Sequence, residues 1–241
     1  MLVPQNVYHL HLLKNPKTTL PDHFGVLCWN IHKTDPKSKK FQNFLHSLKN
    51  SYNLELFLWQ EAPIVEIESL HVEAAANIKT AKNYYGVINA SYTPAVKSYA
   101  YLSLHKELFF TTYKSLLIST YTLSNGSILG VVNIHAINFR EQKAFDKELE
   151  HIYKNLLKFK GALIVAGDFN TWNKKRRLKL YKIMRELHLR RVAFNNDSGV
   201  KSFGSNMLDH IFYRGLKLVS YNVIENHQLS DHQPLIATFT D

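Results

Sequence analysis

Residues 162–170 read Ala-Leu-Ile-Val-Ala-Gly-Asp-Phe-Asn, and this stretch governs how the rest of the chain is interpreted. A short apolar run that ends in Gly and Asp is typical of a buried strand that stops at a polar edge. Side chains two residues apart share a face of a strand, so Ile164 and Ala166 predict that Asp168 and Asn170 continue on the buried face. A carboxylate in that position is costly unless it is paired or binds a metal. The segment therefore predicts a buried strand with a functional group at its end.

Three further predicted strands end in polar residues on a face that is otherwise apolar. These residues are Asn30, Glu61, and the pair Asn133 and His135. Phe57 and Trp59 precede Glu61 at a spacing of two, which predicts that all three share one face. Taken singly, each polar residue has an ordinary explanation as a turn residue or a hydrogen-bonded core side chain. Together, such strand ends would converge in one sheet core, and they predict a polar-floored pocket in which a metal could bind.

The hydrophobic pattern places helices between strands along the chain. We expect strands at 24–30, 54–60, 162–166, 210–213, 218–224 and 235–239, and several more between 84 and 138. We expect helices at 37–50, 65–78, 142–158 and 175–188. This is the plan of a mixed α/β or α+β fold in which helices cover sheets. No repeat or linker interrupts the chain, so we expect an irregular lead-in at 1–23 and a single domain at 24–241.

The composition indicates a folded protein with a polyanionic partner. Of the 241 residues, 45% are hydrophobic and 12% are aromatic, which excludes a disordered chain. The 30 Lys and Arg residues against 19 Asp and Glu give a net charge of +11, which favours nucleic acid, anionic lipid or another phosphate-rich partner. Cys28 is the one cysteine, so the chain can form neither an internal disulfide nor a multi-cysteine zinc site. We expect Cys28 to be a buried strand residue.

The N-terminal region lacks the features of an export signal. Pro4, Asn6, His9 and His11 interrupt any apolar core. No segment of the sequence reaches the roughly 18 apolar residues that span a bilayer. Cytoplasmic residence is the simplest interpretation, with secretion by another route left open, and a monomer is the default expectation. His9 and His11 could hold a metal, but a solvated terminus is the simpler explanation.

Six short motifs follow one another along the chain. They are Trp29-Asn30-Ile31, Trp59-Gln60-Glu61, Asn133-Ile134-His135, Gly167-Asp168-Phe169-Asn170, Leu208-Asp209-His210-Ile211-Phe212 and Ser230-Asp231-His232-Gln233-Pro234. This ordered set, which covers residues 24–239, resembles the endonuclease/exonuclease/phosphatase superfamily with its DNase I-like fold. Within the superfamily, residues 135–139, 180–181 and 212–216 resemble the bacterial YafD-like branch.

The resemblance implies a fold, a reaction and a cofactor. The fold is a four-layer α/β/β/α sandwich, in which two mixed, mainly antiparallel sheets pack face to face with helices outside. The reaction is hydrolysis of a phosphoester by a metal-positioned water, with Mg²⁺ as the expected ion and Mn²⁺ as the alternative. Glu61, Asn30 and Asp231 are the implied metal residues, since Mg²⁺ prefers oxygen ligands.

The resemblance also implies roles in catalysis for three further residues. His232 would be the general base that activates water, because imidazole titrates near neutral pH. Asp209 would fix the tautomer of His232 and stabilise the charged ring. Asp168 would orient the nucleophile or assist the leaving group.

Four more residues are expected to contact the substrate. His135 and Asn170 would donate hydrogen bonds to phosphate oxygens as charge builds on them. Asn133 and Asn138 are further candidates for substrate binding.

A basic segment at 171–191 directly follows Asn170. It holds nine Lys and Arg residues and one acid, Glu186. The candidate substrate-binding cations in it are Lys174, Lys175, Arg176 and Arg177. An apolar stripe from Leu180 to Leu187 predicts a helix that leaves many of these cations in solvent. The segment is either an ordinary solvated helix face or a rim of phosphate contacts that feeds a polyanion toward the site.

Departures from the family pattern narrow the choice of substrate. His135 stands where abasic-site endonucleases of the superfamily usually have Tyr, and residues 202–207 lack the signature of inositol polyphosphate phosphatases. A nuclease or nucleic-acid phosphodiesterase is therefore the first hypothesis. A sphingomyelinase-like phospholipid or small-molecule phosphoesterase is the second, and a catalytically idle nucleic-acid-binding protein is the third. The complete motif set argues against the third, and the lack of an obvious amphipathic membrane helix favours the first over the second.

Overall fold

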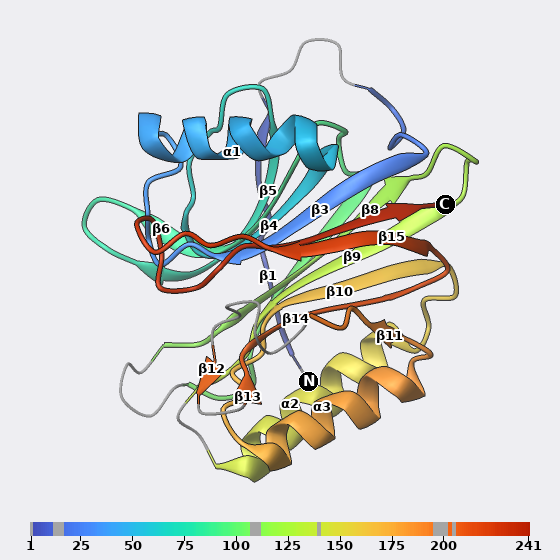
Figure 1. Cartoon of the computed structure of the whole chain (residues 1–241). Coiled ribbons are helices and arrows are strands. Elements are labelled where there is room, and N and C mark those ends of the chain that lie inside the picture. Colours follow the sequence, from blue (N-terminus) through green and yellow to red (C-terminus); the bar gives the residue numbers. More distant parts are fainter. Residues whose placement is uncertain (1, 12–16, 107–111, 139–140, 195–201, 204–205) are drawn as a thin grey trace.

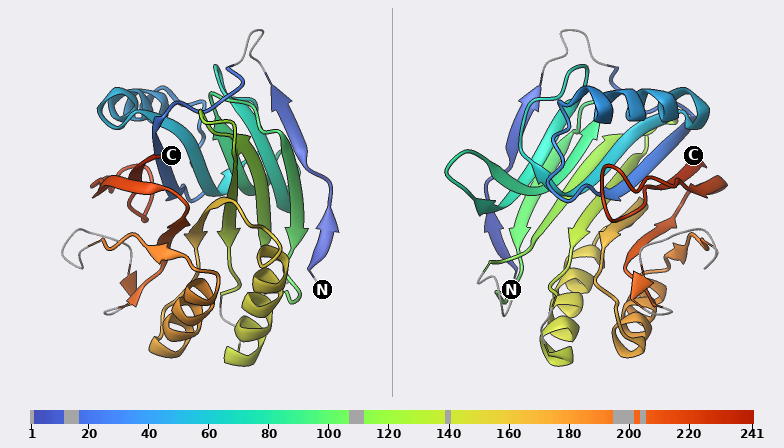
Figure 2. Two further views of the ribbon diagram at one scale, coloured as in Figure 1. Left: turned by 90° about the vertical axis from the view of Figure 1, so that its right-hand side faces the viewer. Right: turned by 60° about the vertical axis from the view of Figure 1, so that its left-hand side comes forward.

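Two seven-stranded β-sheets lie face to face at the centre of the molecule (Figure 1). The structure is a computed structural model that describes residues 2–11, 17–106, 112–138, 141–194, 202–203 and 206–241. Helix α1 (Lys39–Tyr52) covers the outer face of one sheet, and α2 (Gln142–Leu156) and α3 (Lys174–Glu186) cover the outer face of the other (Figure 2). This order of layers confirms the α+β sandwich expected from the sequence.

The first sheet contains one parallel pair, and its other strand pairs are antiparallel. In spatial order its strands are β1 (Val3–Gln5), β7 (Lys97–Leu102), β8 (Ser115–Thr122), β9 (Ile128–His135), β10 (Ala162–Asp168), β14 (Asp209–Arg214) and β11 (Arg190–Arg191). The parallel strands β9 and β10 pair in a register that sets His135 beside Asp168. The antiparallel strands β10 and β14 set Asp168 beside Asp209. Three of the predicted site residues therefore lie in one row across the edge of this sheet.

The second sheet is built in the same way. In spatial order its strands are β15 (Lys217–Val223), β16 (Leu235–Thr240), β3 (His23–Asn30), β4 (Leu54–Pro63), β6 (Tyr84–Ser91), β5 (His71–Lys79) and β2 (Tyr8–His11). The parallel strands β3 and β4 set Asn30 beside Gln60. Nδ2 of Asn30 donates a hydrogen bond to Asp168 across the gap between the sheets, so the polar edges of the two sheets face each other. A small hairpin of β12 (Ser202–Phe203) and β13 (Asn206–Met207) stands apart from both sheets.

Three large apolar clusters hold the four layers together. Between the sheets, Cys28 of β3 packs in one cluster with Ile164 of β10, and Cys28 is buried as expected. On the outer face of the second sheet, Phe41 of α1 lies 5.4 Å from Trp29 and 5.4 Å from Trp59, measured between ring centroids. Helices α2 and α3 bury a similar apolar stripe against the first sheet. Because alternate residues of a central strand serve two clusters, such strands are buried on both faces.

The helix predicted at 65–78 is wrong, because strand β5 occupies most of that segment. Ala74, Ala75 and Ala76 favour a helix by propensity. In the fold, however, β5 lies between β6 and β2 and pairs with both. Alternate residues then face opposite clusters, with Val72 and Ala74 on the α1 side. Pairing along both edges outweighs local propensity, which is weak.

The irregular lead-in expected at 1–23 is also wrong in part. Strand β1 pairs with β7 at the edge of the first sheet, and β2 pairs with β5 at the edge of the second. Pro4 lies in β1, where an edge strand tolerates a residue that cannot donate to the ladder. Lone edge strands of three or four residues carry no pattern of their own, and the sheets supply the pairing that orders them.

The remaining predicted elements are found with ends that differ by a few residues. Between 84 and 138 the structure describes β6, β7, β8 and β9, while residues 107–111 lie outside the description. Among the described residues, no helix is both long and apolar enough to cross a membrane.

Candidate active site

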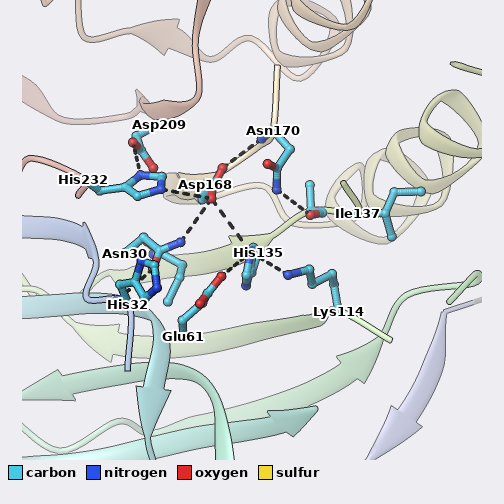
Figure 3. Close-up of polar contacts among 12 residues, drawn as sticks. Asn30, His32, Glu61, Lys114, His135, Ile137, Asp168, Asn170, Asp209 and His232 are labelled. Atoms are coloured by element: carbon cyan, nitrogen blue, oxygen red, sulfur yellow. Dashed lines mark hydrogen bonds and ion pairs between the residues drawn. The ribbon is translucent and has the colours of Figure 1, made fainter. Parts of the chain in front are cut away.

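The polar strand ends of both sheets meet in one cleft of about 560 Å³. The predicted site residues that line it are Asn30, Glu61, His135, Asn138, Asp168, Asn170, Asp231 and His232. Most of these side chains point toward one another in Figure 3, where Asp209 lies next to His232. The convergence expected from strand alternation is therefore present.

Gly167 allows strands β9 and β10 to approach each other beside the cleft. Its φ is +143°, and a Cβ added there would lie 1.9 Å from the carbonyl oxygen of Ile134. Only glycine fits a backbone approach this close in that conformation. The glycine of the Gly-Asp-Phe-Asn motif thus brings Asp168 level with His135 of the neighbouring strand.

Asp168 is a buried carboxyl group held from two sides. Its Oδ1 accepts the backbone N–H of Asn170 at 2.9 Å, and its Oδ2 accepts Nδ2 of Asn30 at 3.2 Å. Nε2 of His232 lies 3.9 Å from the same Oδ2. Burial and, next to it, the negative charge of Asp209 raise the pKa of Asp168 to about 6, although His232 opposes the shift. The carboxyl group can therefore exchange a proton near neutral pH.

His232 and Asp209 form a buried hydrogen-bonded pair on the wall of the cleft. Nδ1 of His232 lies 2.7 Å from Oδ2 of Asp209. Nε1 of Trp29 donates to the carbonyl oxygen of His232 at 2.8 Å, and Oγ of Ser230 accepts its backbone N–H at 3.1 Å. These bonds fix the ring so that Nε2 faces Asp168 and the cleft. The predicted partners are adjacent, and their catalytic roles remain predictions.

Glu61 reaches the cleft through an irregularity in strand β4. Phe57 and Trp59 belong to the cluster under α1, and regular alternation would send Glu61 to the same face. Instead, the pairing of β4 with β6 shifts register between Trp59 and Ala62, and Glu61 has a φ of +50°. Such a β-bulge re-aims a side chain, and Oε1 of Glu61 comes to lie 3.7 Å from Nε2 of His135. The predicted shared face is therefore wrong, although Glu61 does line the cleft.

Lys114 is a cleft residue that the sequence analysis missed. Its Nζ lies 2.9 Å from Nε2 of His135, and its side chain is buried. Burial and the Lys114 cation hold the pKa of His135 well below its ordinary value, so the ring is neutral. An ammonium group can only donate, so Nε2 accepts and the ring proton lies on Nδ1. The hydrogen-bond donor beside the cleft is therefore Nζ of Lys114 and not Nε2 of His135. The sequence had indicated His135 as the donor to phosphate oxygens.

Lys114 belongs to none of the six motifs in the sequence. It stands just before β8, after residues 107–111 that lie outside the description, and it carries no alternation signal. The antiparallel pairing of β8 with β9, in which Leu116 lies opposite Ile134, brings Lys114 beside His135. The position of Lys114 in the cleft follows from the strand order of the first sheet. The sequence did not specify that order.

Asn133 lies in the core and not in the cleft, so its predicted contact with substrate is wrong. It is fully buried between the sheets. Its Nδ2 donates to the carbonyl oxygens of Trp59 at 3.1 Å and Ile88 at 2.9 Å, and its Oδ1 accepts Nε2 of Gln60 at 2.7 Å. Asn133 is two residues short of the strand end, and there its polar groups join the two sheets.

Arg176 is buried as well, although the sequence placed it among exposed cations. Its Nη1 donates to the carbonyl oxygens of Ile137 at 2.9 Å and Asn170 at 3.2 Å. The first turn of α3 directs this side chain inward, toward the apolar cluster under the helices. The other three cations remain accessible, with Lys174 and Lys175 exposed and Arg177 half-buried.

The predicted metal residues present hard oxygen donors to the cleft. Glu61 and Asp231 offer carboxylates, and the side chain of Asp231 is 50% exposed. Its Oδ1 lies 2.9 Å from Nδ1 of His32. Oδ1 of Asn30 accepts the backbone N–H of His32 at 3.1 Å and keeps a second lone pair. This donor set suits Mg²⁺, which binds through one or two carboxylates and keeps several waters.

A second set of donors lies deeper in the same region. Ligand atoms of Asp168, Asp209 and His232 lie within 4.8 Å of one another. The buried Oδ1 of Asp209 has no hydrogen-bond partner among the described residues. A cation placed there would compete with the hydrogen bond between His232 and Asp209. A cation bound at Glu61, Asn30 and Asp231 would leave the hydrogen bond between His232 and Asp209 intact.

The paired sheets, with a cleft of carboxylates, amides and histidines at one edge, define a protein of the DNase I-like class. The profile of the endonuclease/exonuclease/phosphatase family matches residues 27–232, and the chain belongs to that family. The resemblance found in the ordered motifs is thereby confirmed. Proteins of this family are hydrolases that act on phosphoesters.

Two bacterial relatives extend over most of the chain. A UPF0294 protein from Vibrio campbellii is 35% identical over 224 residues, which cover 90% of this chain and 77% of the relative. A UPF0294 protein from Yersinia enterocolitica is 33% identical over 235 residues, which cover 93% of this chain and 87% of the relative. These relatives are YafD-family proteins, so the predicted branch is confirmed.

Solved structures share the fold at low sequence identity. A family protein from Leptotrichia buccalis has a TM-score of 0.68 at 14% identity, covering 90% of this chain and 100% of that chain. ANGEL2, a 2′,3′-cyclic phosphatase, has a TM-score of 0.64 at 17% identity, covering 90% and 95%. TDP2 from D. rerio, solved with a single-stranded DNA product, has a TM-score of 0.58 at 15% identity, covering 91% and 99%.

Proposed function

We propose that this protein is a divalent-metal-dependent phosphodiesterase that cleaves nucleic acid by attack of water on phosphorus. The proposal rests on the buried pair of His232 and Asp209. Nε2 of His232 faces a cleft that Glu61 and Lys114 also line. A base, a carboxylate that can hold a cation and a cation that can bind phosphate are the groups such a reaction requires.

His232 is the general base of the proposed reaction. Its Nε2 takes a proton from water, while the hydrogen bond from Nδ1 to Asp209 fixes the tautomer and stabilises the imidazolium. Asp168 orients the attacking water, because its Oδ2 lies 3.9 Å from the same Nε2. Mg²⁺ held by Glu61, Asn30 and Asp231 would neutralise phosphate charge and stabilise the departing oxygen.

Lys114 and Asn170 bind the phosphate in this proposal. Nζ of Lys114 lies 2.9 Å from Nε2 of His135, and this contact holds the ammonium group at the cleft. Nδ2 of Asn170 donates one N–H to the carbonyl oxygen of Ala136 at 2.9 Å and carries a second. Donors fixed in this way stabilise charge on phosphate oxygens without rearranging during the reaction.

Replacing Lys114 with Met is expected to lower kcat/KM on a small phosphodiester by at least about 10-fold. A hydrogen bond to a charged group is worth about 1.5 to 3 kcal/mol, and each 1.36 kcal/mol is tenfold in rate. Lys114→Arg should retain part of the activity because it keeps the charge. Lys97→Met is the matched control, since Lys97 is exposed at the start of β7 and pairs with Thr120 near the far end of β8. Equal activity in the two Met variants would contradict this role.

Nucleic acid is the favoured substrate class because the chain carries a net charge of +11 and a basic helix begins beside the cleft. Helix α3 starts four residues after Asn170, and its N-cap is Asn173. The solved relatives include TDP2 with a single-stranded DNA product and the endonuclease domain of the retrotransposon TRAS1. These observations support a rim of phosphate contacts along the first turn of α3.

Replacing Lys174, Lys175 and Arg177 with Gln is expected to weaken nucleic-acid binding and flatten its salt dependence. Each phosphate that the protein no longer neutralises removes about 0.9 from the slope of log affinity against log salt on duplex DNA. Hydrolysis of a small diester should stay near wild type, because the described lining of the cleft does not include these side chains. Binding to duplex and single-stranded DNA at several salt concentrations measures the effect.

The matched control for this rim removes the same charge elsewhere. Lys154, Lys158 and Lys160 are exposed at and beyond the end of α2, just before β10 begins at Ala162. Strand β10 runs from there to Asp168, so these cations lie at the opposite end of the strand from the cleft. If both triple variants bind with the same affinity and salt slope, the rim does not exist. The lipid or small-phosphoester function would then be the better one.

A substrate panel at fixed Mg²⁺ tests the proposed function. It compares plasmid, single-stranded DNA, RNA, sphingomyelin and a generic phosphate diester. We expect turnover of nucleic acid and of the small diester, and loss of both in excess chelator. Turnover of sphingomyelin alone would move the substrate to the lipid class. Lack of turnover of every substrate by the folded, Mg²⁺-loaded protein would contradict the enzymatic function.

A further inference from the structure

The guanidinium group of Arg176 lies between the two turns that follow β9 and β10. Nη1 donates to the carbonyl oxygen of Ile137, two residues after the end of β9. The same nitrogen donates to the carbonyl oxygen of Asn170, two residues after the end of β10. His135 and Asn138 flank the first contact along the chain, and Asn170 itself lines the cleft. One buried cation therefore bridges the turn of Asn170, which binds phosphate in the proposed function, and the turn that follows His135.

The surroundings of Arg176 fix it in this place. Its guanidinium carbon lies 4.5 Å from the ring centroid of Phe145 and 4.9 Å from that of Trp172. Its own backbone N–H donates to Oδ1 of Asn173, the N-cap of α3, at 2.8 Å. Burial lowers the pKa of Arg176 to about 10, with Glu148 acting in the opposite direction, so the group stays charged at neutral pH.

The turn after β10 has a left-handed backbone conformation where it serves the cleft. Asn170 has a φ of +50°, in the left-handed region that asparagine tolerates better than most residues other than glycine. In this conformation its backbone N–H reaches Oδ1 of Asp168, and its Nδ2 reaches the carbonyl oxygen of Ala136. The contact from Arg176 to the carbonyl oxygen of Asn170 thus holds the residue that aligns Asp168.

We propose that Arg176 is a positioning residue that locks the two turns in the geometry the reaction needs, without touching substrate itself. This inference rests on the proposed function, because it assigns Arg176 a part in the same site. The planar guanidinium can donate to two carbonyl oxygens in fixed directions, whereas the ammonium group of lysine acts as a point charge. The contribution of Arg176 is therefore to the position of Asn170 and of residues 136–138, and not only to the packing of α3.

Two substitutions test the bridge through catalysis. Arg176→Met and Arg176→Lys should lower kcat on a small diester by up to about 100-fold, the cost of misplacing reacting groups by about 1 Å. KM should change little, because the misplaced donors act in the transition state. Arg185→Met is the matched control: it removes an exposed arginine in the last turn of the same helix, far along α3 from the two turns, and it should keep the kcat of wild type. All variants are assayed well below their melting temperatures.

Chemical rescue separates positioning from simple loss of packing. In Arg176→Ala, guanidinium ion at tens of millimolar, far below its denaturing range of roughly molar concentration, can enter the space left by the side chain. It should restore part of kcat in Arg176→Ala and leave wild type and Arg185→Ala unchanged. A folded Arg176→Met with wild-type kcat would overturn the proposal, as would an Arg176→Ala that guanidinium fails to rescue.

Amide hydrogen exchange provides a readout that does not depend on activity. In Arg176→Met, residues 136–138 and 169–172 should exchange faster than in wild type, while α1 stays unchanged. Unchanged exchange in both turns would overturn the proposal. If wild type hydrolyses no phosphodiester, the proposed function is contradicted by that assay alone. Faster exchange in these turns would still support Arg176 as the residue that holds them.

Discussion

A variant that lacks both His232 and Asp209 is expected to be about as active as a variant that lacks one of them. His232→Ala and Asp209→Ala should each lower kcat by at least about 100-fold, the usual scale for loss of a general base. The two groups act as a unit because Nδ1 of His232 lies 2.7 Å from Oδ2 of Asp209 and both are buried. Once one is lost, the other has no partner through which to act, so their losses are strongly non-additive.

The measurement is kcat on a small diester at fixed Mg²⁺ for the two single variants and the double variant. His46→Ala is the matched control, since His46 is exposed on α1, and it should keep wild-type activity. Near-ultraviolet circular dichroism checks that each variant is folded, because removal of one partner leaves a buried polar group behind. A double loss equal to the product of the single losses would show that the residues act independently.

Much of the candidate site could be predicted because alternation continues to the end of three strands. Val26 and Cys28 face the gap between the sheets, and Asn30 follows them into the cleft. Ile164 and Ala166 lead to Asp168 in the same way. The rule works there because a regular strand fixes the direction of every side chain from the first.

The sequence could not predict where a strand departs from regularity. Glu61 lies in the cleft only because the bulge after Trp59 turns it away from the face that Phe57 occupies. A bulge depends on pairing with the neighbouring strand β6, which local sequence does not encode. Both the strand pattern and the motif led to the prediction that Glu61 lies in the pocket, but in this fold regular alternation would have directed its side chain under α1.

Burial of polar residues was the other source of error. Arg176 was predicted to bind substrate because it stands in the basic segment after Asn170, and Asn133 because it lies near the polar end of a predicted strand. Each is buried by partners from distant segments, Ile137 and Asn170 for the arginine and Gln60 for the asparagine. The predicted helix at 65–78 is wrong because of partners from other segments as well. Pairing of β5 with β6 and β2 outweighs the helix propensity of its alanines.

Glu61→Gln is expected to lower hydrolysis of a small diester by at least about 100-fold and to weaken binding of Mg²⁺. The substitution keeps the shape of the side chain and removes the charge that would hold the ion. Stabilisation of phosphate charge by a bound metal is worth several kcal/mol, and each 1.36 kcal/mol is tenfold in rate. The positive φ of Glu61 adds weight to this expectation, because such strain is retained mainly at functional positions.

Calorimetric titration with Mg²⁺ or Mn²⁺ separates Glu61 from the deeper donors. Glu66→Gln is the matched control: its carboxylate is exposed in the segment after β4, and its loss should change neither ion binding nor hydrolysis. If Asp209→Asn abolishes ion binding while Glu61→Gln leaves it intact, the ion belongs with Asp168, Asp209 and His232. Full activity of Glu61→Gln, or of wild type in excess chelator, would exclude a metal held by Glu61. Loss of both activity and ion affinity in Glu61→Gln alone would place the cation at the bulge of β4, where a strained backbone presents a carboxylate to the cleft.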